Sequence, residues 1–487
     1  MTISPPRPGA AIGHRSTQRL PSAFRLRTEM SGISEAPGKV WFWELAAAVI
    51  DADRCVQCGA CVAACPTDSI GIGTDDLPQL VKMCTGCSLC WDFCPRGGLR
   101  YEATWLKEHG EEPALLHESA SALAGAASAA SLASGSASSR AEAVIVPTAA
   151  PLPRRRAGSS VAVVAASGQA AEASSTDWRI TGADPAPGLG LVINKVAARV
   201  RPGSTLSVVG AQDGGVSAIL LSTLAAGDID GAVVAREDPD HSWKGVPLLA
   251  TTAASIRERG GSYYNQTMAL ASLDLAAAGL DADAKVAIVG TPCEIQGIRA
   301  LQARQWRRGR SNVDAVVLSI ALLCTKSFDY RKLMLQALRD DRGIDLAEVG
   351  KVDVIHGRLI VEDRVGANMV DEPIKDFHGA ALMGCDECAD FLGRAADISV
   401  GSVGSEAGYS SVLVRTEAGR RAFDLTAPEL EISELSQPDA LLRLDKLDKK
   451  IARTTLQREL DPDGPLFVDF AEHVTFYGGT DRAPVWK

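Results

Sequence analysis

The stretch CVQCGACVAACP, residues 55–66, places four cysteines and a proline within twelve positions. A second copy of its spacing lies 29 positions downstream, where Cys84 and Pro95 correspond to Cys55 and Pro66. The chain has 12 cysteines among 487 residues, which is too small a fraction for a disulfide scaffold. We therefore expect the cysteines to bind metal.

Each copy reads C-x2-C-x2-C-x3-C-P, the run that holds 4Fe-4S clusters in bacterial ferredoxins. The first three thiolates of a run bind one cluster and the fourth binds the other, and such clusters relay single electrons. The spacing predicts one cluster on Cys55, Cys58, Cys61 and Cys94, and a second on Cys84, Cys87, Cys90 and Cys65. Zinc also binds C-x2-C pairs, but two copies of a three-plus-one run ending in proline are not typical of zinc sites.

Four cysteines lie outside this repeat, namely Cys293, Cys324, Cys385 and Cys388. Cys293 follows an expected strand and begins an expected helix, where the helix dipole favours a thiolate. A third 4Fe-4S cluster needs four ligands, so the cysteine count predicts three clusters that use all 12 thiols. Buried structural cysteines, a zinc site and a redox role for Cys293 alone are alternatives that the sequence leaves open.

The composition is that of a globular chain, with 46% hydrophobic residues and 50 Lys and Arg against 60 Asp and Glu. No basic run with interleaved aromatic residues indicates nucleic-acid binding. The longest apolar runs are shorter than the roughly 20 residues that cross a bilayer. We expect a cytoplasmic protein with no nucleic-acid partner and no integral membrane segment. Residues 1–28, which contain five arginines and no acidic residue, also match the composition of a targeting segment.

The residue pattern predicts a multidomain α+β protein. Residues 113–180 are rich in Ala, Ser and Pro and lack the periodicity of a buried face, which indicates a flexible linker. Beyond it, short β-branched runs alternate with helical stretches, as in an α/β domain with a largely parallel sheet. The expected order is a disordered arm (1–40), a two-cluster ferredoxin-like module (41–112), the linker (113–180), an α/β domain (181–285), a mixed α+β domain (286–455) and a C-terminal extension (456–487).

The stretch LSVVGAQDGGVSAILLSTLAAGDIDGAVVA, residues 206–235, is expected to form a strand, a glycine loop, a helix and a strand. Gly214 and Gly215 would let the backbone approach a ligand, and the helix N-terminus offers N–H groups to a phosphate. A tight turn explains the glycines equally well. The loop matches neither the nicotinamide fingerprint nor the P-loop. Single-electron clusters need a partner that also handles electron pairs, and flavin is the usual one.

Four strings together resemble the coenzyme F420 hydrogenase/dehydrogenase beta-subunit family: AQDGGVSAILLSTLAAGDIDGAVV, GTPCEIQGIRAL, CDECADFLGRAADISVGSVGSEAGYSSVLVRT and DRAPVW. The resemblance implies FAD in the 181–285 domain, and in the 286–455 domain a third cluster on the scattered cysteines and the substrate site. It places the FAD-side loop at Gln212, Asp213, Gly214 and Gly215, and it places Thr291 and Pro292 beside flavin and cluster. We also expect four further residues near the flavin: Thr251, Thr252, Ser262 and Tyr263.

The resemblance implies an iron-sulfur flavoprotein oxidoreductase. FAD would exchange a hydride with a small organic partner, with coenzyme F420 favoured. Three 4Fe-4S clusters would relay single electrons to or from a redox protein such as a ferredoxin or another subunit. No Asp, Glu or His is assigned a catalytic role. The alternatives are a tetrapyrrole reductase and a non-catalytic electron-transfer subunit of a larger complex. The linker is longer than in the family, which leaves open whether the ferredoxin-like module docks permanently.

Overall fold

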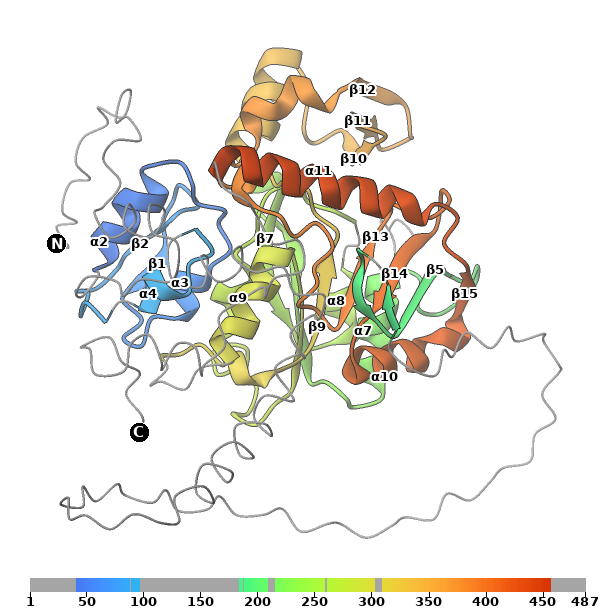
Figure 1. Cartoon of the computed structure of the whole chain (residues 1–487), viewed down its shortest axis with the longest axis horizontal. Coiled ribbons are helices and arrows are strands. Elements are labelled where there is room, and N and C mark those ends of the chain that lie inside the picture. Colours follow the sequence, from blue (N-terminus) through green and yellow to red (C-terminus); the bar gives the residue numbers. More distant parts are fainter. Residues whose placement is uncertain are drawn as a thin grey trace, which may run out of the picture. The chain divides into compact units, whose positions relative to one another are not determined.

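The computed structural model describes residues 41–87, 89–96, 184–186, 188–208, 215–258, 261–302 and 309–456 (Figure 1). The expected arm (1–40), the expected linker (113–180) and the C-terminal extension beyond residue 456 lie outside these described residues. All described residues belong to one compact unit, Met1–Leu116 with Thr181–Lys487. Within the described stretches, no helix has both the length and the apolar character needed to cross a membrane.

The ferredoxin-like module repeats its structure as it repeats its sequence. Its elements are α2 (Phe42–Leu45), the π-helical turn η3 (Ala46–Ile50), α3 (Ala60–Ala63), β1 (Ile70–Ile72), β2 (Pro78–Leu80) and α4 (Leu89–Asp92), coloured blue in Figure 1. Helices α3 and α4 begin 29 positions apart, each inside one cysteine run. Strands β1 and β2 pair antiparallel, with Ile70 opposite Leu80. The spacing of the cysteines therefore fixes the local fold of the module.

Eight strands form the main sheet, in the order β15-β5-β14-β13-β9-β8-β6-β7. They are β5 (Asn194–Val200), β6 (Gly231–Asp238), β7 (His241–Ala250), β8 (Val286–Gly290), β9 (Val316–Leu322), β13 (Ile398–Gly401), β14 (Ser410–Val414) and β15 (Leu430–Ser433). The four central strands β13, β9, β8 and β6 are parallel, and antiparallel strands flank them on both sides. The fold is mixed α/β, and only its central part has the expected parallel sheet. The boundary expected at residue 285 falls within this sheet.

Helices cover both faces of the sheet. The helical segments of this part are α7 (Gly215–Ala225), α8 (Ala253–Arg257), η4 (Ala269–Ser272), α9 (Pro292–Gln302), η5 (Val313–Ala315), η6 (Arg331–Asp340), α10 (Glu417–Thr426), η9 (Ala427–Glu429) and α11 (Pro438–Leu456). Of these, η6 belongs to a separate core with Val352 and Val361. Val286 and Ile288 of β8 share a core with Ile295 and Ile298 of α9. Ala287, which lies between Val286 and Ile288 in β8, is also fully buried. Because successive strand residues point to opposite faces, β8 is covered on both sides.

Two smaller sheets complete the described chain. Strands β10 (Val349–Ile355), β11 (Arg358–Asp363) and β12 (Asn368–Pro373) form an antiparallel sheet, and β3 (Asp184–Ala186) pairs with β4 (Gly190–Val192). The 3-10 segments η7 (Ile374–Ala380) and η8 (Met383–Glu387) follow β12. Segment η8 carries the chain back toward the main sheet and contains Cys385, so it positions one of the scattered cysteines.

The strand expected at the start of residues 206–235 is not formed in its described part, residues 206–208. Consecutive turns replace it, since the N–H of Leu206 donates to Ser204 Oγ (3.0 Å) and the N–H of Ser207 donates to the Ser204 carbonyl (3.3 Å). A hydroxyl that bonds its own backbone competes with strand pairing. The helix and second strand of this stretch do form, as α7 and β6.

The ferredoxin-like module packs against the rest of this unit through a shared hydrophobic core. Val56, Ala60 and Phe93 of the module belong to the same buried cluster as Leu270 and Ile298. Close contact continues at the polar edge, where Lys244 Nζ lies 2.8 Å from an Asp76 carboxylate oxygen. Burial of apolar side chains is the main favourable contribution to such packing.

Candidate functional site

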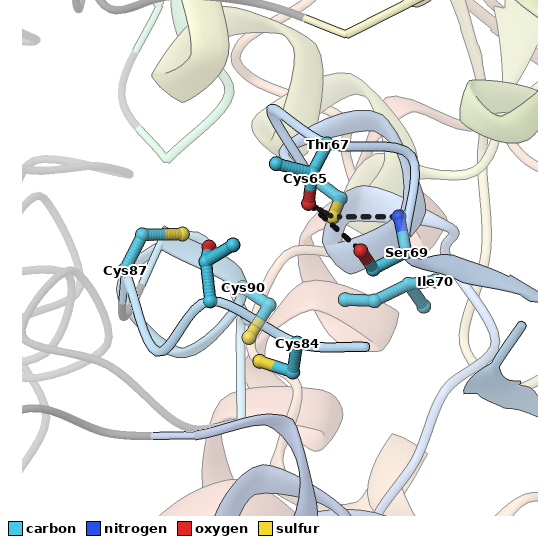
Figure 2. Close-up of a pocket in the computed structure, with 8 residues that line it drawn as sticks. Cys65, Thr67, Ser69, Ile70, Cys84, Cys87 and Cys90 are labelled. Carbon is cyan, nitrogen blue, oxygen red and sulfur yellow. Dashed lines mark hydrogen bonds between the residues drawn. The ribbon is translucent and has the colours of Figure 1, made fainter. Parts of the chain in front are cut away.

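The four cysteines predicted for the second cluster line one pocket of the module. Cys65, Cys84, Cys87 and Cys90 surround a space of about 290 Å³, part of it open to solvent, and Figure 2 shows their side chains around it. The N–H of Ser69 donates to Cys65 Sγ (3.2 Å). The N–H of Gly86 donates to Cys84 Sγ (3.3 Å). Cys87 is exposed, so this group reaches the protein surface.

The four cysteines predicted for the first cluster also come together. Burial raises the pKa of the Cys61 thiol, and negative charge on Cys55, Cys58 and Cys94 raises it further. Burial likewise raises the pKa of Cys55, against a hydrogen bond from the N–H of Gln57 to Cys55 Sγ (3.4 Å). These mutual effects require the thiols to be neighbours. The ligand roles of both groups remain predictions.

The four scattered cysteines form a third group outside the sheet. Cys293 and Cys324 follow the carboxyl ends of the adjacent parallel strands β8 and β9, the edge where such sheets bind ligands. Burial raises the pKa of Cys324, and negative charge on Cys385 and Cys388 raises it further. Burial raises the pKa of Cys385 to about 11. Burial also raises the pKa of Cys293, and negative charge on Cys388 adds to this effect. The topology thus brings together the four cysteines that the sequence leaves dispersed.

Gln266 connects the two loops of the third group. Its Nε2 donates to Thr291 Oγ1 (2.7 Å), and its Oε1 accepts a hydrogen bond from Ser327 Oγ (2.8 Å). The N–H of Ser327 in turn donates to Cys385 Sγ (3.5 Å). Thr291 Oγ1 lies 3.2 Å from Cys293 Sγ. Sequence reasoning missed Gln266 and Ser327, because neither belongs to a spaced motif.

Glu294 is a buried carboxyl beside the third group, and sequence reasoning also missed it. It accepts hydrogen bonds from the N–H of Ala269 and the N–H of Thr291, both at 2.8 Å. Burial raises its pKa to about 7 against these hydrogen bonds. The carboxyl thereby fixes the turn that begins α9, where Cys293 lies.

A buried ion pair joins the first and third groups. Arg54 Nε lies 2.6 Å from Glu387 Oε1, and Arg96 Nε donates to the carbonyl of Gly384 (2.7 Å). Arg54 precedes Cys55, and Glu387 precedes Cys388. Negative charge on Cys58 also raises the pKa of Cys293, after the effect of burial. The first group of the module therefore lies next to the third group.

The residues predicted to contact flavin are not all brought together. Gln212, Asp213 and Gly214 lie outside the described residues, and Gly215 is the first residue of α7. Thr291 and Pro292 begin α9, beside the third group. Thr251 follows β7 at the edge where β8 begins, because Ala250 pairs with Ala232 and Gly231 pairs with Val286. That is the edge opposite Thr291. Ser262 is exposed, and Tyr263 packs against Gly245 of β7.

Thr252 caps the N-terminus of a short helix. It is the N-cap of α8, where its Oγ1 accepts a hydrogen bond from the N–H of Ser255 (3.1 Å). We expect Thr252→Ala to lower the free energy of unfolding by about 1 kcal/mol and Thr252→Ser to restore it, as measured by chemical denaturation with a parallel flavin assay. Loss of flavin at unchanged stability would instead assign Thr252 to the flavin site.

The donor atoms suit iron-sulfur clusters, since each group offers four thiols and soft sulfur ligands select such clusters. Within the described ranges, no three His, Cys, Asp or Glu side chains lie close enough together to hold a single metal ion. Ligands of a 4Fe-4S cube stand further apart, because four irons lie between them.

Comparison with known protein families matches three parts of the chain to family domains. Residues 48–100 match the 4Fe-4S dicluster domain. Residues 200–274 match the N-terminal part, and residues 283–438 the C-terminal part, of the coenzyme F420 hydrogenase/dehydrogenase beta subunit. The module thus belongs to a domain type that carries 4Fe-4S clusters, and the two other matches lie in the part that holds the main sheet and the third group.

Named relatives agree with this assignment. The chain is 33% identical to one of the subunits of the F(420)H(2) dehydrogenase of Methanosarcina mazei over 47% of its length and 63% of that protein, so it spans less than two thirds of that relative. It is 32% identical to the beta subunit of the coenzyme F420 hydrogenase of Methanosarcina barkeri over 49% of this chain and 79% of that one. A chain of the F420-reducing NiFe hydrogenase complex from Methanosarcina barkeri superposes with a TM-score of 0.51 and 29% identity, covering 57% of this chain and 98% of that one. The chain therefore belongs to the coenzyme F420 hydrogenase/dehydrogenase beta-subunit family.

Proposed function

We propose that this protein is an iron-sulfur flavoprotein oxidoreductase in which FAD exchanges a hydride with coenzyme F420. Three 4Fe-4S clusters would carry single electrons between the flavin and a redox partner. The observation that carries the proposal is that Cys293 and Cys385 of the third group pack against the same buried cluster as Cys58 of the first group. Three groups of four thiols, arranged in series, are what a chain of one-electron carriers needs.

The side chains around the third group suit this role. The cationic guanidinium of Arg96 lowers the pKa of Cys385 and Cys388 against the larger, opposite effect of burial. A cation here favours the thiolate, which is the form that binds iron. Lys326 and Asp386 form an ion pair between the loop of Cys324 and the turn of Cys385. These contacts orient the ligands.

FAD, when bound, would interconvert one hydride and two single electrons. On our proposal the flavin lies at the carboxyl edge of the parallel strands, where Thr291 follows β8. Gln266 holds the Thr291 hydroxyl in place and so positions this end of the site. The first residue of α7, Gly215, belongs to a helix of eleven residues, whose N-terminal N–H groups can bind an anionic phosphate.

An electron-transfer subunit without its own hydride chemistry is the second candidate. It is favoured by the names of the relatives, which include parts of a dehydrogenase and of a hydrogenase. Such a protein would bind clusters and pass electrons but would not react with coenzyme F420 by itself.

The separating experiment uses the full chain purified without oxygen. Reduced coenzyme F420 is added with methyl viologen as the electron acceptor, and its oxidation is followed by the return of absorbance. We expect turnover by the isolated chain. An absence of turnover in protein that contains its full iron and flavin would favour the electron-transfer role.

A further inference from the structure

A second cavity lies between the first cysteine run and β7. It encloses about 480 Å³, part of it open to solvent, which is within the size range of small-molecule sites, roughly 300–1,000 Å³. Gln57 of the module lines one side, and Lys244, Gln266 and Tyr330 line the other. Gln57 adjoins Cys58 of the first group, and Gln266 bonds to Thr291 beside the third group. The cavity is therefore lined by residues that adjoin the first and the third cysteine group.

The backbone at Gln57 adopts a conformation that suits glycine. Its φ is 52°, in the left-handed region, which non-glycine residues enter at an energetic cost. The equivalent position in the second copy, 29 residues later, is Gly86, with φ of 70°. Both N–H groups perform the same task, each donating to the sulfur of the first cysteine in its run. A glycine at position 57 would therefore meet every backbone requirement that the structure shows.

The two positions differ in what surrounds them. A Cβ atom at Gly86 would lie 2.9 Å from the Trp41 ring, which leaves no room for a side chain. The Gln57 side chain instead lines the cavity, in a residue that is only 4% exposed. The side chain is therefore kept at a position whose backbone conformation favours glycine.

Other residues that line this cavity also have a strained backbone. Two more of its lining residues, Asp76 and Met268, have positive φ values of 60° and 56°. Such strain persists mostly where function requires a fixed geometry. The rest of the lining is mixed, with apolar and aromatic side chains such as Val246 and Tyr330 beside polar and charged ones such as Asn265 and Asp329. A carboxamide presents a donor and an acceptor side by side. The complementary ligand is a planar heteroaromatic ring with a lactam or imide edge.

We propose that this cavity binds the ring system of the organic hydride partner and that Gln57 pairs with its lactam edge. The inference rests on the proposed function, which puts the flavin near Thr291. Bound there, the ring would contact Gln266 and so lie beside the flavin. The module then supplies one wall of the substrate site in addition to its electron carriers.

The test compares wild type with Gln57→Gly, using oxidised coenzyme F420 as the probe in an anaerobic fluorescence titration of the full chain. Gln79→Gly, at a glutamine of β2 outside the cavity, is the control. Loss of one buried pair of hydrogen bonds should weaken the binding of coenzyme F420 by roughly tenfold in Gln57→Gly. The affinity of Gln79→Gly should equal that of wild type. Iron and flavin contents should equal those of wild type. The melting temperature of Gln57→Gly should be equal or higher, because glycine relieves the strained φ.

Each other outcome counts against the inference. Equal affinity in Gln57→Gly and wild type, with wild-type turnover of coenzyme F420 intact, overturns the cavity assignment alone. Loss of flavin from Gln57→Gly overturns it as well, because the cavity would then belong to the flavin site. A wild type that neither binds nor oxidises coenzyme F420 contradicts the proposed function, and the cavity assignment fails with it.

Discussion

Replacement of Cys293 by serine should remove the third cluster and disconnect the flavin from the ferredoxin-like module. Iron should fall from about twelve to about eight atoms per chain, because each cluster holds four. Oxidation of coenzyme F420 with a ferredoxin as acceptor should fall by at least about 100-fold, because even residues that only support a ligand cost 10- to 100-fold when removed. Iron analysis and acceptor-linked rates measure the two effects.

The control for this variant is Met383→Ser, which places a serine in η8, the turn that carries Cys385. Met383 is 52% exposed, so its replacement should leave iron content and rate at the wild-type level. If Cys293→Ser retained twelve irons and full rate, Cys293 would not be a ligand and the series of three clusters would be broken.

Replacement of Glu387 by alanine should strongly destabilise the packing of the module against the rest of the unit. The Arg54 and Glu387 side chains are only 12% and 8% exposed, and removal of Glu387 leaves the buried Arg54 charge without its carboxylate, although Arg54 still donates to the Arg96 carbonyl. Breaking such a pair costs about 3–5 kcal/mol. We expect this loss in the free energy of unfolding, measured by chemical denaturation, together with weaker magnetic coupling between clusters in EPR spectra.

Two further variants test whether the loss of the buried ion pair causes the loss of stability. Glu417→Ala removes an exposed ion pair with Arg420 and should leave the denaturation midpoint unchanged. The double variant Arg54→Met with Glu387→Met should recover much of the loss, because apolar residues of similar volume replace buried ion pairs well. A Glu387→Ala protein as stable as wild type would show that the pair does not hold the module in place.

The cysteine groups of the module could be foreseen because their spacing is local. The fourth cysteine of a run crosses to the other cluster, and the structure accordingly puts Cys65 with Cys84, Cys87 and Cys90 around one pocket. The scattered group was inferred from a count and a family resemblance. Its proximity depends on which strands are neighbours in the sheet, and no spacing in the sequence encodes that order.

Other features depend on contacts between distant segments. Gln266 and the Arg54–Glu387 pair act across the fold, so a single sequence gives no periodic signal for them. The error at residues 206–208 has a local cause, because the apolar pattern suggested a strand while Ser204 formed turns with the same backbone. Thr252 is the N-cap of α8, and its expected place near the flavin stays a prediction.

The most direct test of the central proposal is a count of iron, acid-labile sulfide and flavin in wild-type protein purified without oxygen. Three clusters built on all 12 thiols predict about twelve irons and twelve sulfides, together with one FAD per chain. Zinc in place of iron, or about eight irons with no flavin, would contradict the account.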